Sequence, residues 1–311
     1  MPAGSGWLAR FAVIILMFIV VGCSAFQPTS KPETVLVGGA TGRQGTAVVG
    51  ELLRRGYRVR GLTRKPDGKK ALALAARGVE IVQGDYSDAA SLAAALADID
   101  KVFFYSGFSR NEVAEGENVI AAARAAGVKH LVYSSGAAAE PGKGVPDAAK
   151  MQVEESIVSS GITYTVFRPV AFMENLNRQQ KLVAKKGITD SRDPERMLHF
   201  IAIKDIGFFV GEAFDHSEEW SDVAINIASD RMTVAEYVQT IGNVMGRSVP
   251  YNQQPLEDYL DAMPKPLRPL FRWYEDAGYE ADVDLFRQRY PNLTTLDGYL
   301  RATGWENWQS D

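Results

Sequence analysis

Three glycines near the start of the chain constrain its fold more than any other feature. They stand at Gly39, Gly42 and Gly45, in the spacing G-x-x-G-x-x-G, directly after a strand-like run over residues 34–37. A helical pattern with one apolar face follows over residues 48–53. The first two glycines permit a tight turn and close approach of a pyrophosphate, the third lets the helix pack on the strand, and the helix N-terminus offers N–H groups to phosphates. Because a strand and a helix flank the motif, we interpret it as a dinucleotide loop rather than an ordinary glycine-rich turn.

The rest of the chain alternates short β-rich runs with amphipathic runs, as in a doubly wound parallel α/β sheet. We expect any ligand to lie over the carboxyl ends of the strands. Beyond Pro169 the alternation loosens, although Thr233 and Glu236 form a capping box that opens a helix closed at Gly246. The predicted strands are 34–37, 57–63, 79–82, 101–105, 130–134, 163–168 and 223–227, and the predicted helices after the first one are 71–77, 87–96 (capped by Ser87), 111–126 (ended by Gly127), 149–159 and 296–305.

Composition and charge exclude several classes of function. The chain has 311 residues and a net charge of -4, with no basic cluster that interleaves aromatics, which argues against nucleic-acid binding. Its single cysteine rules out an internal disulfide framework and a thiolate metal cluster. His130, His199 and His216 lie far apart in sequence, so we expect no metal site.

Two cations follow the second predicted strand, where an NAD-binding protein would carry an acid about 20 residues past the glycines. Arg64 and Lys65 stand there, and no carboxylate occurs before Asp67. A guanidinium grips phosphate with two parallel hydrogen bonds, so this pattern favours NADP(H) over NAD(H), with Arg43 as a second cation. A solvated basic turn is the alternative. Asp85 follows the third strand, where its carboxylate could accept a hydrogen bond from the adenine amino group. The alternative is an aspartate that stands near a helix N-terminus because the helix dipole favours a negative charge there.

The first residues resemble an export signal. Arg10 is the only charged side chain before an unbroken apolar run over residues 11–21, which is short for a membrane span and typical of a signal-peptide core. The run ends in Ile-Val-Val-Gly-Cys, which resembles the bacterial lipoprotein signal with Cys23 as the lipidated residue. We expect a membrane-anchored lipoprotein with a signal peptide over 1–23 and a tether over 24–32. An uncleaved anchor or a spurious leader on a cytoplasmic protein are the alternatives, and the expected cytosolic location of nicotinamide cofactors conflicts with export.

Several stretches together resemble the NmrA-like family, atypical members of the short-chain dehydrogenase/reductase superfamily. The stretch 37–45 looks like the family's opening, and no single motif is decisive. The other matching segments are 167–169 with 172–175 (R-P-x-x-F-x-E-N), 204–207 (D-I-G), 227–233, 246–251 (G-R-x-V-x-Y), 290–291 and 304–305.

The resemblance implies a Rossmann domain over 33–168 and a small C-terminal lobe with the substrate region over 169–311. It also implies a set of residues that line the dinucleotide. For Lys150 the residues alone favour an exposed helix position, and Phe172 and Met173 could equally be core. The implied set, with the loop and cation residues already named, is Gly39, Ala40, Thr41, Gly42, Arg43, Gln44, Gly45, Arg64, Lys65, Asp85, Tyr105, Ser106, Gly107, Lys150, Phe172, Met173, Glu174 and Asn175.

The acid/base tyrosine typical of the superfamily is missing. In a Tyr-x-x-x-Lys pair ending at Lys150, the tyrosine position is occupied by Pro146, which has no ionisable group. Tyr105 and Tyr133 lie near predicted strand ends and could substitute, although Tyr133 could equally be buried. The catalytic residues are therefore left unassigned.

Two hypotheses about function remain open. Ser134 and Ser135 follow the fifth strand, where the superfamily places a carbonyl-orienting hydroxyl, but small polar residues are also ordinary turn chemistry. The first hypothesis is an NADPH-dependent oxidoreductase acting on a small carbonyl or quinone-like substrate. The second is a non-catalytic NADP(H) sensor that regulates a protein partner.

Overall fold

Strands and helices alternate along most of the chain. The computed structural model describes residues 32–107, 109–142 and 147–307. The predicted leader, the tether up to residue 31, Cys23 and Pro146 lie outside the described residues. The strands are β1 (Thr34–Val37), β2 (Arg58–Thr63), β3 (Glu80–Gln83), β4 (Lys101–Tyr105), β5 (His130–Ser134), β6 (Tyr164–Pro169), β7 (Ala171–Phe172), β8 (Ile188–Asp190), β9 (Met197–Ile201), β10 (Val223–Ile227), β11 (Asp230–Thr233) and β12 (Tyr251–Gln253).

The helices follow most of these strands. The α-helices are α2 (Arg43–Arg54), α3 (Lys69–Ala75), α4 (Ala89–Leu96), α5 (Glu112–Ala125), α6 (Ala148–Val158), α7 (Gln180–Lys186), α8 (Ile203–Asp215), α9 (Ser217–Trp220), α10 (Val234–Met245), α11 (Leu256–Asp261), α12 (Arg268–Asp276), α13 (Val283–Arg289) and α14 (Leu296–Ala302). Short 3₁₀ turns are η2 (Ala137–Ala139), η3 (Met173–Arg178), η4 (Lys265–Leu267) and η5 (Trp305–Asn307).

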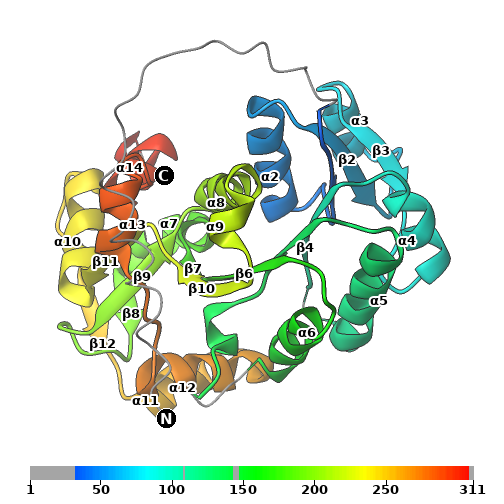
Figure 1. Cartoon of the computed structure of the whole chain (residues 1–311). Helices are drawn as coiled ribbons and strands as arrows, with labels where there is room; N and C mark the ends of the chain where they lie inside the picture. Colours follow the sequence, from blue (N-terminus) through cyan, green and yellow to red (C-terminus); the bar gives the residue numbers. More distant parts are fainter. Residues whose placement is uncertain (1–31, 108, 143–146, 308–311) are drawn as a thin grey trace, which may run out of the picture. The chain divides into compact units, whose positions relative to one another are not determined.

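A sheet of seven strands, in the order β10-β6-β5-β4-β1-β2-β3, organises these elements (Figure 1). Every neighbouring pair in it runs parallel. The order reverses between β1 and β4, because the chain builds β2 and β3 on one side of β1 and the later strands on the other. The predicted doubly wound α/β sheet is confirmed, and β1 and β4 define the switch point where ligands bind in such sheets.

Helices cover both faces of the sheet, and its central strands β1 and β4 are accordingly nearly continuous apolar runs. Phe103 and Phe104 are consecutive residues of β4 that point to opposite faces, and both are fully buried. Helices α4, α5 and α6 pack side by side over a core that contains Phe104, whereas α2 and α8 pack together on the other face (Figure 1).

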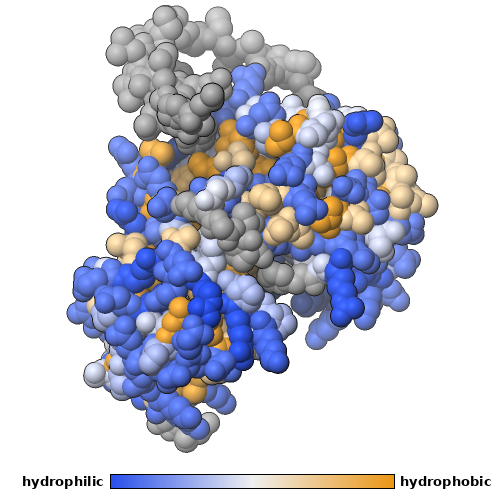
Figure 2. All heavy atoms as spheres, turned by 90° about the horizontal axis from the view of Figure 1, so that it is seen from below, coloured by the Kyte–Doolittle hydropathy of each residue, from blue (hydrophilic) through white to orange (hydrophobic). Residues whose placement is uncertain are grey.

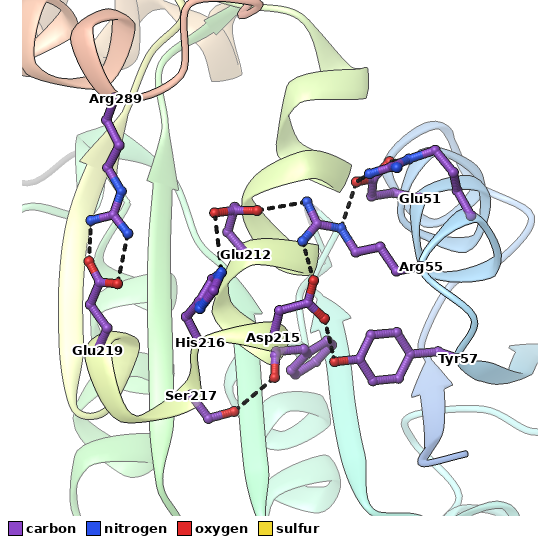
Figure 3. Close-up of polar contacts among 11 residues, drawn as sticks. Glu51, Arg55, Tyr57, Glu212, Asp215, His216, Ser217, Glu219 and Arg289 are labelled. Atoms are coloured by element: carbon purple, nitrogen blue, oxygen red, sulfur yellow. Dashed lines mark hydrogen bonds and ion pairs between the residues drawn. The ribbon is translucent and has the colours of Figure 1, made fainter. Parts of the chain in front are cut away.

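Helix α8 lies unusually close to α2. A Cβ at Gly207 would lie 2.8 Å from the carbonyl oxygen of Ala47, and one at Gly211 would collide with the side chain of Arg55. The half-buried Arg55 then joins the C-terminal ends of the two helices, since its guanidinium pairs with Glu51 of α2 at 2.7 Å and with Glu212 and Asp215 of α8 (Figure 3). Two glycines and the half-buried Arg55 thus hold α8, which lies well beyond residue 168, against α2 of the nucleotide-binding half.

The remaining elements build a smaller lobe with its own apolar core. Its sheets are β11-β9-β7 and β12-β8, and its core includes residues of α10 and α14. The predicted capping box opens α10, with Thr233 and Glu236 bonded reciprocally, and Gly246 ends the helix with φ +66°. The small C-terminal α/β lobe is confirmed, although most of its short strands were not predicted.

One local prediction needs correction. The helix predicted to begin at Ser87 is capped instead by Asp88, whose carboxylate accepts from the N–H groups of Ala90 and Ser91 at 3.0 and 3.3 Å. Ser87 is engaged in a turn with Asp85. The strand predicted at 223–227 is confirmed as β10, and it pairs with β6 as the seventh strand of the main sheet.

Hydrophilic and hydrophobic side chains are interspersed on the face of the molecule seen in Figure 2. In the part of the chain that the structure describes, no helix combines the length and apolar character needed to cross a bilayer.

Candidate functional site

The glycine loop lies at the switch point of the sheet and is tied to both neighbouring strands. The N–H of Gly38 donates to Phe103 of β4 at 2.8 Å, and the N–H of Ala40 donates to Leu62 of β2 at 3.2 Å. Gly39 has φ +61°, a left-handed conformation that favours glycine. The predicted tight turn at the first glycine is therefore present.

The N-terminus of α2 is free to bind an anion. Its N-cap, Gly42, has no side chain to cap it, and no acidic residue stands in the first turn. The first turn of a helix leaves its N–H groups without intrahelical acceptors, and the helix dipole makes that end positive. A Cβ at Gly45 would collide with the carbonyl oxygen of Gly39, so the third glycine permits the close helix packing that the motif predicts.

The cations predicted to recognise a 2′-phosphate lie at the carboxyl end of β2. Arg64 and Lys65 are both exposed there, next to Thr63, whose hydroxyl lies 3.4 Å from that of Thr41 in the glycine loop. Hydrogen bonds from the backbone and hydroxyl of Ser87 lower the pKa of Asp85, and the positive charge of nearby Arg64 lowers it further. Asp85 and Arg64 thus lie together beside the loop.

Arg43, the first residue of α2, is exposed. Its positive charge acts on Tyr105 and Glu174, whereas that of Arg64 acts on Asp85. No contact in the described residues brings Arg43 to the end of β2. The role of Arg43 as a second cation for the 2′-phosphate stays a prediction.

Tyr105, at the carboxyl end of β4, lies against the glycine loop. Its hydroxyl donates to the carbonyl oxygen of Gly39 at 3.2 Å, and a Cβ at Gly42 would collide with that hydroxyl. Burial raises the pKa of the phenol, so Tyr105 is a protonated donor at neutral pH. The next residues, Ser106 and Gly107, differ sharply, because Ser106 is buried and Gly107 is exposed.

Lys150 is buried, contrary to the exposed position that the residues alone favoured. Its ammonium pairs with Glu112 and donates to the hydroxyl of Ser106 at 3.3 Å. That hydroxyl also bonds to Glu112 and lies 2.7 Å from the phenol oxygen of Tyr133. Sequence analysis missed Glu112, because an acid in the first turn of a helix is usually a solvated residue favoured by the dipole.

The end of β5 holds two hydroxyls with different surroundings. Ser134 donates to the side-chain oxygen of Gln44 in α2 at 2.7 Å. Ser135 is buried, and its hydroxyl has no partner among the described residues. Tyr133 is fully buried, so its phenol does not face a bound substrate, and burial raises the pKa of that phenol.

The predicted segment 172–175 divides between core and site. Met173 is fully buried in the core of the smaller lobe, so its side chain takes the core alternative and does not line a dinucleotide. Phe172 is half-buried and Asn175 is exposed. Glu174 caps α8, since both carboxylate oxygens accept from the N–H of Ile203 at 3.0 and 3.1 Å. Burial raises the pKa of Glu174, and this hydrogen bond and Arg43 oppose that shift.

A cavity of about 700 Å³ lies at the opposite, amino edge of the sheet, lined by residues such as Tyr57, Lys101 and Ser217. Several of its charged groups are paired within the protein. Lys101 pairs with Glu33 at 2.7 Å, and Asp215 pairs with Arg55 (Figure 3). We do not assign the site there, because ligands of doubly wound sheets bind at the carboxyl edge. Among the described residues no group of acids and histidines could hold a metal ion.

The parallel sheet and the glycine loop at its switch point define a Rossmann-type α/β protein. A model of the NmrA-like family matches residues 31–300, and the chain belongs to that family. The resemblance deduced from the sequence motifs is therefore confirmed.

Three known proteins illustrate the range of this likeness. The chain is 30% identical over 230 residues to an NAD(P)H azoreductase of Xenophilus azovorans, covering 74% of this chain and 80% of that protein. Its fold resembles an NADPH-dependent quinone oxidoreductase from Escherichia coli solved with NADPH (TM-score 0.74, 23% identity, 86% of this chain and 99% of that one). It equally resembles NmrA, a negative transcriptional regulator solved with NADP (TM-score 0.73, 18% identity, 88% and 95% covered).

Proposed function

We propose that this protein is an NADPH-dependent reductase that acts on a quinone-like or other small carbonyl substrate. The observation that carries the proposal is the uncapped N-terminus of α2 at the sheet's switch point, beside Arg64 at the end of β2. Both solved proteins described above contain NADP(H), and of the three similar proteins one is an azoreductase and another a quinone oxidoreductase by name.

The residues present fit an NADP(H) dinucleotide. The N–H groups of the first turn of α2 would hold the pyrophosphate, because they are unsatisfied donors at a positive helix end. Arg64 and Lys65 would hold the 2′-phosphate, and Asp85 would accept from the adenine amino group. When bound, the cofactor would supply a hydride at its nicotinamide ring.

The side chains that could act as a general acid limit the class of substrate. Tyr133 is fully buried, and the residue four positions before Lys150 is Pro146, which cannot donate. The hydroxyl of Tyr105, the other candidate, donates to the carbonyl oxygen of Gly39. A simple ketone needs an acid at the developing alkoxide, whose conjugate acid has a high pKa. A quinone becomes a resonance-stabilised hydroquinone anion, which takes its proton from water. The lack of the usual tyrosine therefore favours quinone-like acceptors.

An acceptor panel tests the proposal. Purified protein is mixed with NADPH and a benzoquinone, a naphthoquinone, an azo dye, an aromatic aldehyde or a simple ketone, and the loss of NADPH absorbance is followed. We expect turnover with quinones and little with the ketone. Tight NADPH binding without turnover on any acceptor would overturn the reductase assignment.

A second function, a non-catalytic NADP(H)-sensing regulator, is favoured by one observation, the proline at the tyrosine position. The likeness to the regulator NmrA supports it. Under this alternative, NADP⁺ and NADPH would change the affinity for a protein partner by different factors. The acceptor panel separates the two, since a sensor binds the cofactor without consuming it.

A further inference from the structure

We propose that Glu112 is a positioning residue of the cofactor site, and that Lys150 acts there through Glu112 and Ser106 rather than by contacting the cofactor. The inference rests on the proposed NADPH-binding function. It differs from the role that the family resemblance implies for Lys150, which is to line the dinucleotide.

The cluster is buried on every side. The exposed fractions are 4% for Glu112, 7% for Ser106, 7% for Lys150 and 0% for Tyr133. Glu112 accepts from both the Lys150 ammonium and the Ser106 hydroxyl, and Ser106 also contacts the Tyr133 phenol. A second carboxylate, Asp147, lies farther from the ammonium, at 3.9 Å. Glu112 is therefore the direct counter-ion of Lys150.

Close helix packing places the two charges together. Helices α5 and α6 contact each other over one face of the sheet (Figure 1). A Cβ at Gly116 would lie 2.7 Å from Val153, so glycine lets the helices approach there. Glu112 precedes Gly116 by one turn, and Lys150 precedes Val153 by about one turn. The pair therefore lies just N-terminal to the point of closest approach.

The cluster is connected to the glycine loop through the end of β4. Ser106 directly follows Tyr105, and the Tyr105 phenol donates to Gly39. A shift of Ser106 would move Tyr105, and with it the contact on the loop. Removing one charge of a buried pair leaves the other uncompensated, and such a charge relaxes by drawing in water or moving its neighbours. Removal of the charge of either Glu112 or Lys150 should therefore disturb the glycine loop and weaken cofactor binding.

A double-mutant cycle separates positioning from direct contact. Lys150→Met, Glu112→Gln and the double variant are purified, and the NADPH Kd and the thermal midpoint of each are measured. If the pair acts as a unit, each single change weakens NADPH binding by about 10-fold or more, and the double variant returns to within about 3-fold of wild type. If Lys150 contacts the cofactor directly, the double variant stays as weak as Lys150→Met, which would overturn the inference.

A buried lysine at the other end of the same strand is the matched control. Lys101 of β4 is 6% exposed and pairs with Glu33 at the amino edge of the sheet. Lys101→Met should lower the thermal midpoint but leave the NADPH Kd unchanged. An equal loss of NADPH affinity in this control would assign the effect of the cluster to general destabilisation and overturn the positioning role.

The same experiment distinguishes the two proposals from each other. If wild-type protein binds no NADPH, the proposed function fails, and this inference fails with it. If wild type binds NADPH but the changes at Glu112 and Lys150 are additive, only the inference fails. The pH dependence of NADPH binding gives a further readout, since the profile of the double variant should match that of wild type and that of Glu112→Gln should not.

Discussion

The hydroxyl of Tyr105 donates to the carbonyl oxygen of Gly39 at 3.2 Å, which joins the end of β4 to the glycine loop. The contact requires glycine at position 42, because a Cβ there would collide with the same hydroxyl. The second glycine of the motif therefore makes room for a side chain of this protein as well as for any phosphate.

Gly42→Ala should weaken NADPH binding by about 10-fold or more, because the new methyl group displaces Tyr105 from the loop. Adding Tyr105→Phe removes the colliding oxygen and should restore part of the affinity. Gly50→Ala in the same helix is the control, since its nearest neighbour would be a side-chain nitrogen of Arg77 at 3.5 Å. That change should leave binding intact and stabilise the protein by about 0.5–1 kcal/mol through helix propensity. Calorimetric titration and urea unfolding measure both effects, and unchanged binding in Gly42→Ala would refute this account.

Arg64→Ala should raise the Kd for NADPH by about 10- to 100-fold and leave the Kd for NADH nearly unchanged, because only NADPH carries the 2′-phosphate. Fluorescence titration with both cofactors measures the ratio. The control is Arg124→Ala, an exposed arginine in the last turn of α5. Equal losses for the two cofactors would show that Arg64 does not recognise the 2′-phosphate.

His130 should make the protein less stable as the pH falls below neutrality. Burial lowers the pKa of His130 from 6.5 to about 4, with a smaller contribution from Lys101. Its ring is held between the hydroxyls of Ser217 and Thr165, at 3.2 and 2.8 Å. Between about pH 6.5 and pH 4 the unfolded chain binds a proton that the folded chain does not. The free energy of unfolding therefore decreases as the pH is lowered through this range, by up to about 3 kcal/mol.

Urea unfolding at several pH values across that window tests the contribution of His130. His130→Gln should be less stable than wild type near pH 7 and should show a shallower decline toward pH 4. His216→Gln, which changes an exposed histidine, should follow the wild-type curve. Parallel curves for wild type and His130→Gln would exclude His130 as the source of the slope.

Cys23 remains a predicted lipidation site, and we propose a membrane-anchored form of the protein on that basis. Expression of the full chain in a bacterium should yield a mature protein that begins at Cys23, with an acylated cysteine in the membrane fraction. Cys23→Ala should abolish the acyl group and release the protein from that fraction. Intact-mass spectrometry measures where the mature chain begins and whether its cysteine is acylated. A mature chain that retains residues 1–22 would refute the prediction.

Much of the fold could be predicted because its signals are local. Strand boundaries at 101–105 and 130–134 agree with β4 and β5, and Gly127 has the expected left-handed conformation, with φ +70°. The capping box at Thr233 was likewise predictable, because its partners lie three residues apart. Such features depend on side chains that meet within one turn of the backbone.

Most residues of the candidate cofactor site, at the carboxyl edge of the sheet, could also be predicted from the sequence, because of the sheet topology. The carboxyl ends of parallel strands meet at one edge, so residues that follow different strands, such as Gly39, Arg64, Asp85 and Tyr105, come together once the strands are identified. Met173 was harder to assign, because an apolar residue near a site has the same signature whether it packs inward or outward.

The amino-acid sequence alone was sufficient for the doubly wound sheet, the phosphate-binding loop and the missing tyrosine, since spacing and residue type carry that information. Only the tertiary structure decided what surrounds Lys150, because its counter-ion Glu112 lies 38 residues away in the sequence and belongs to a different helix. The same holds for α8, whose Asp215 reaches Arg55 across 160 residues. Partners that distant are selected by the packing of helices against each other and the sheet, and no periodicity in the chain records them.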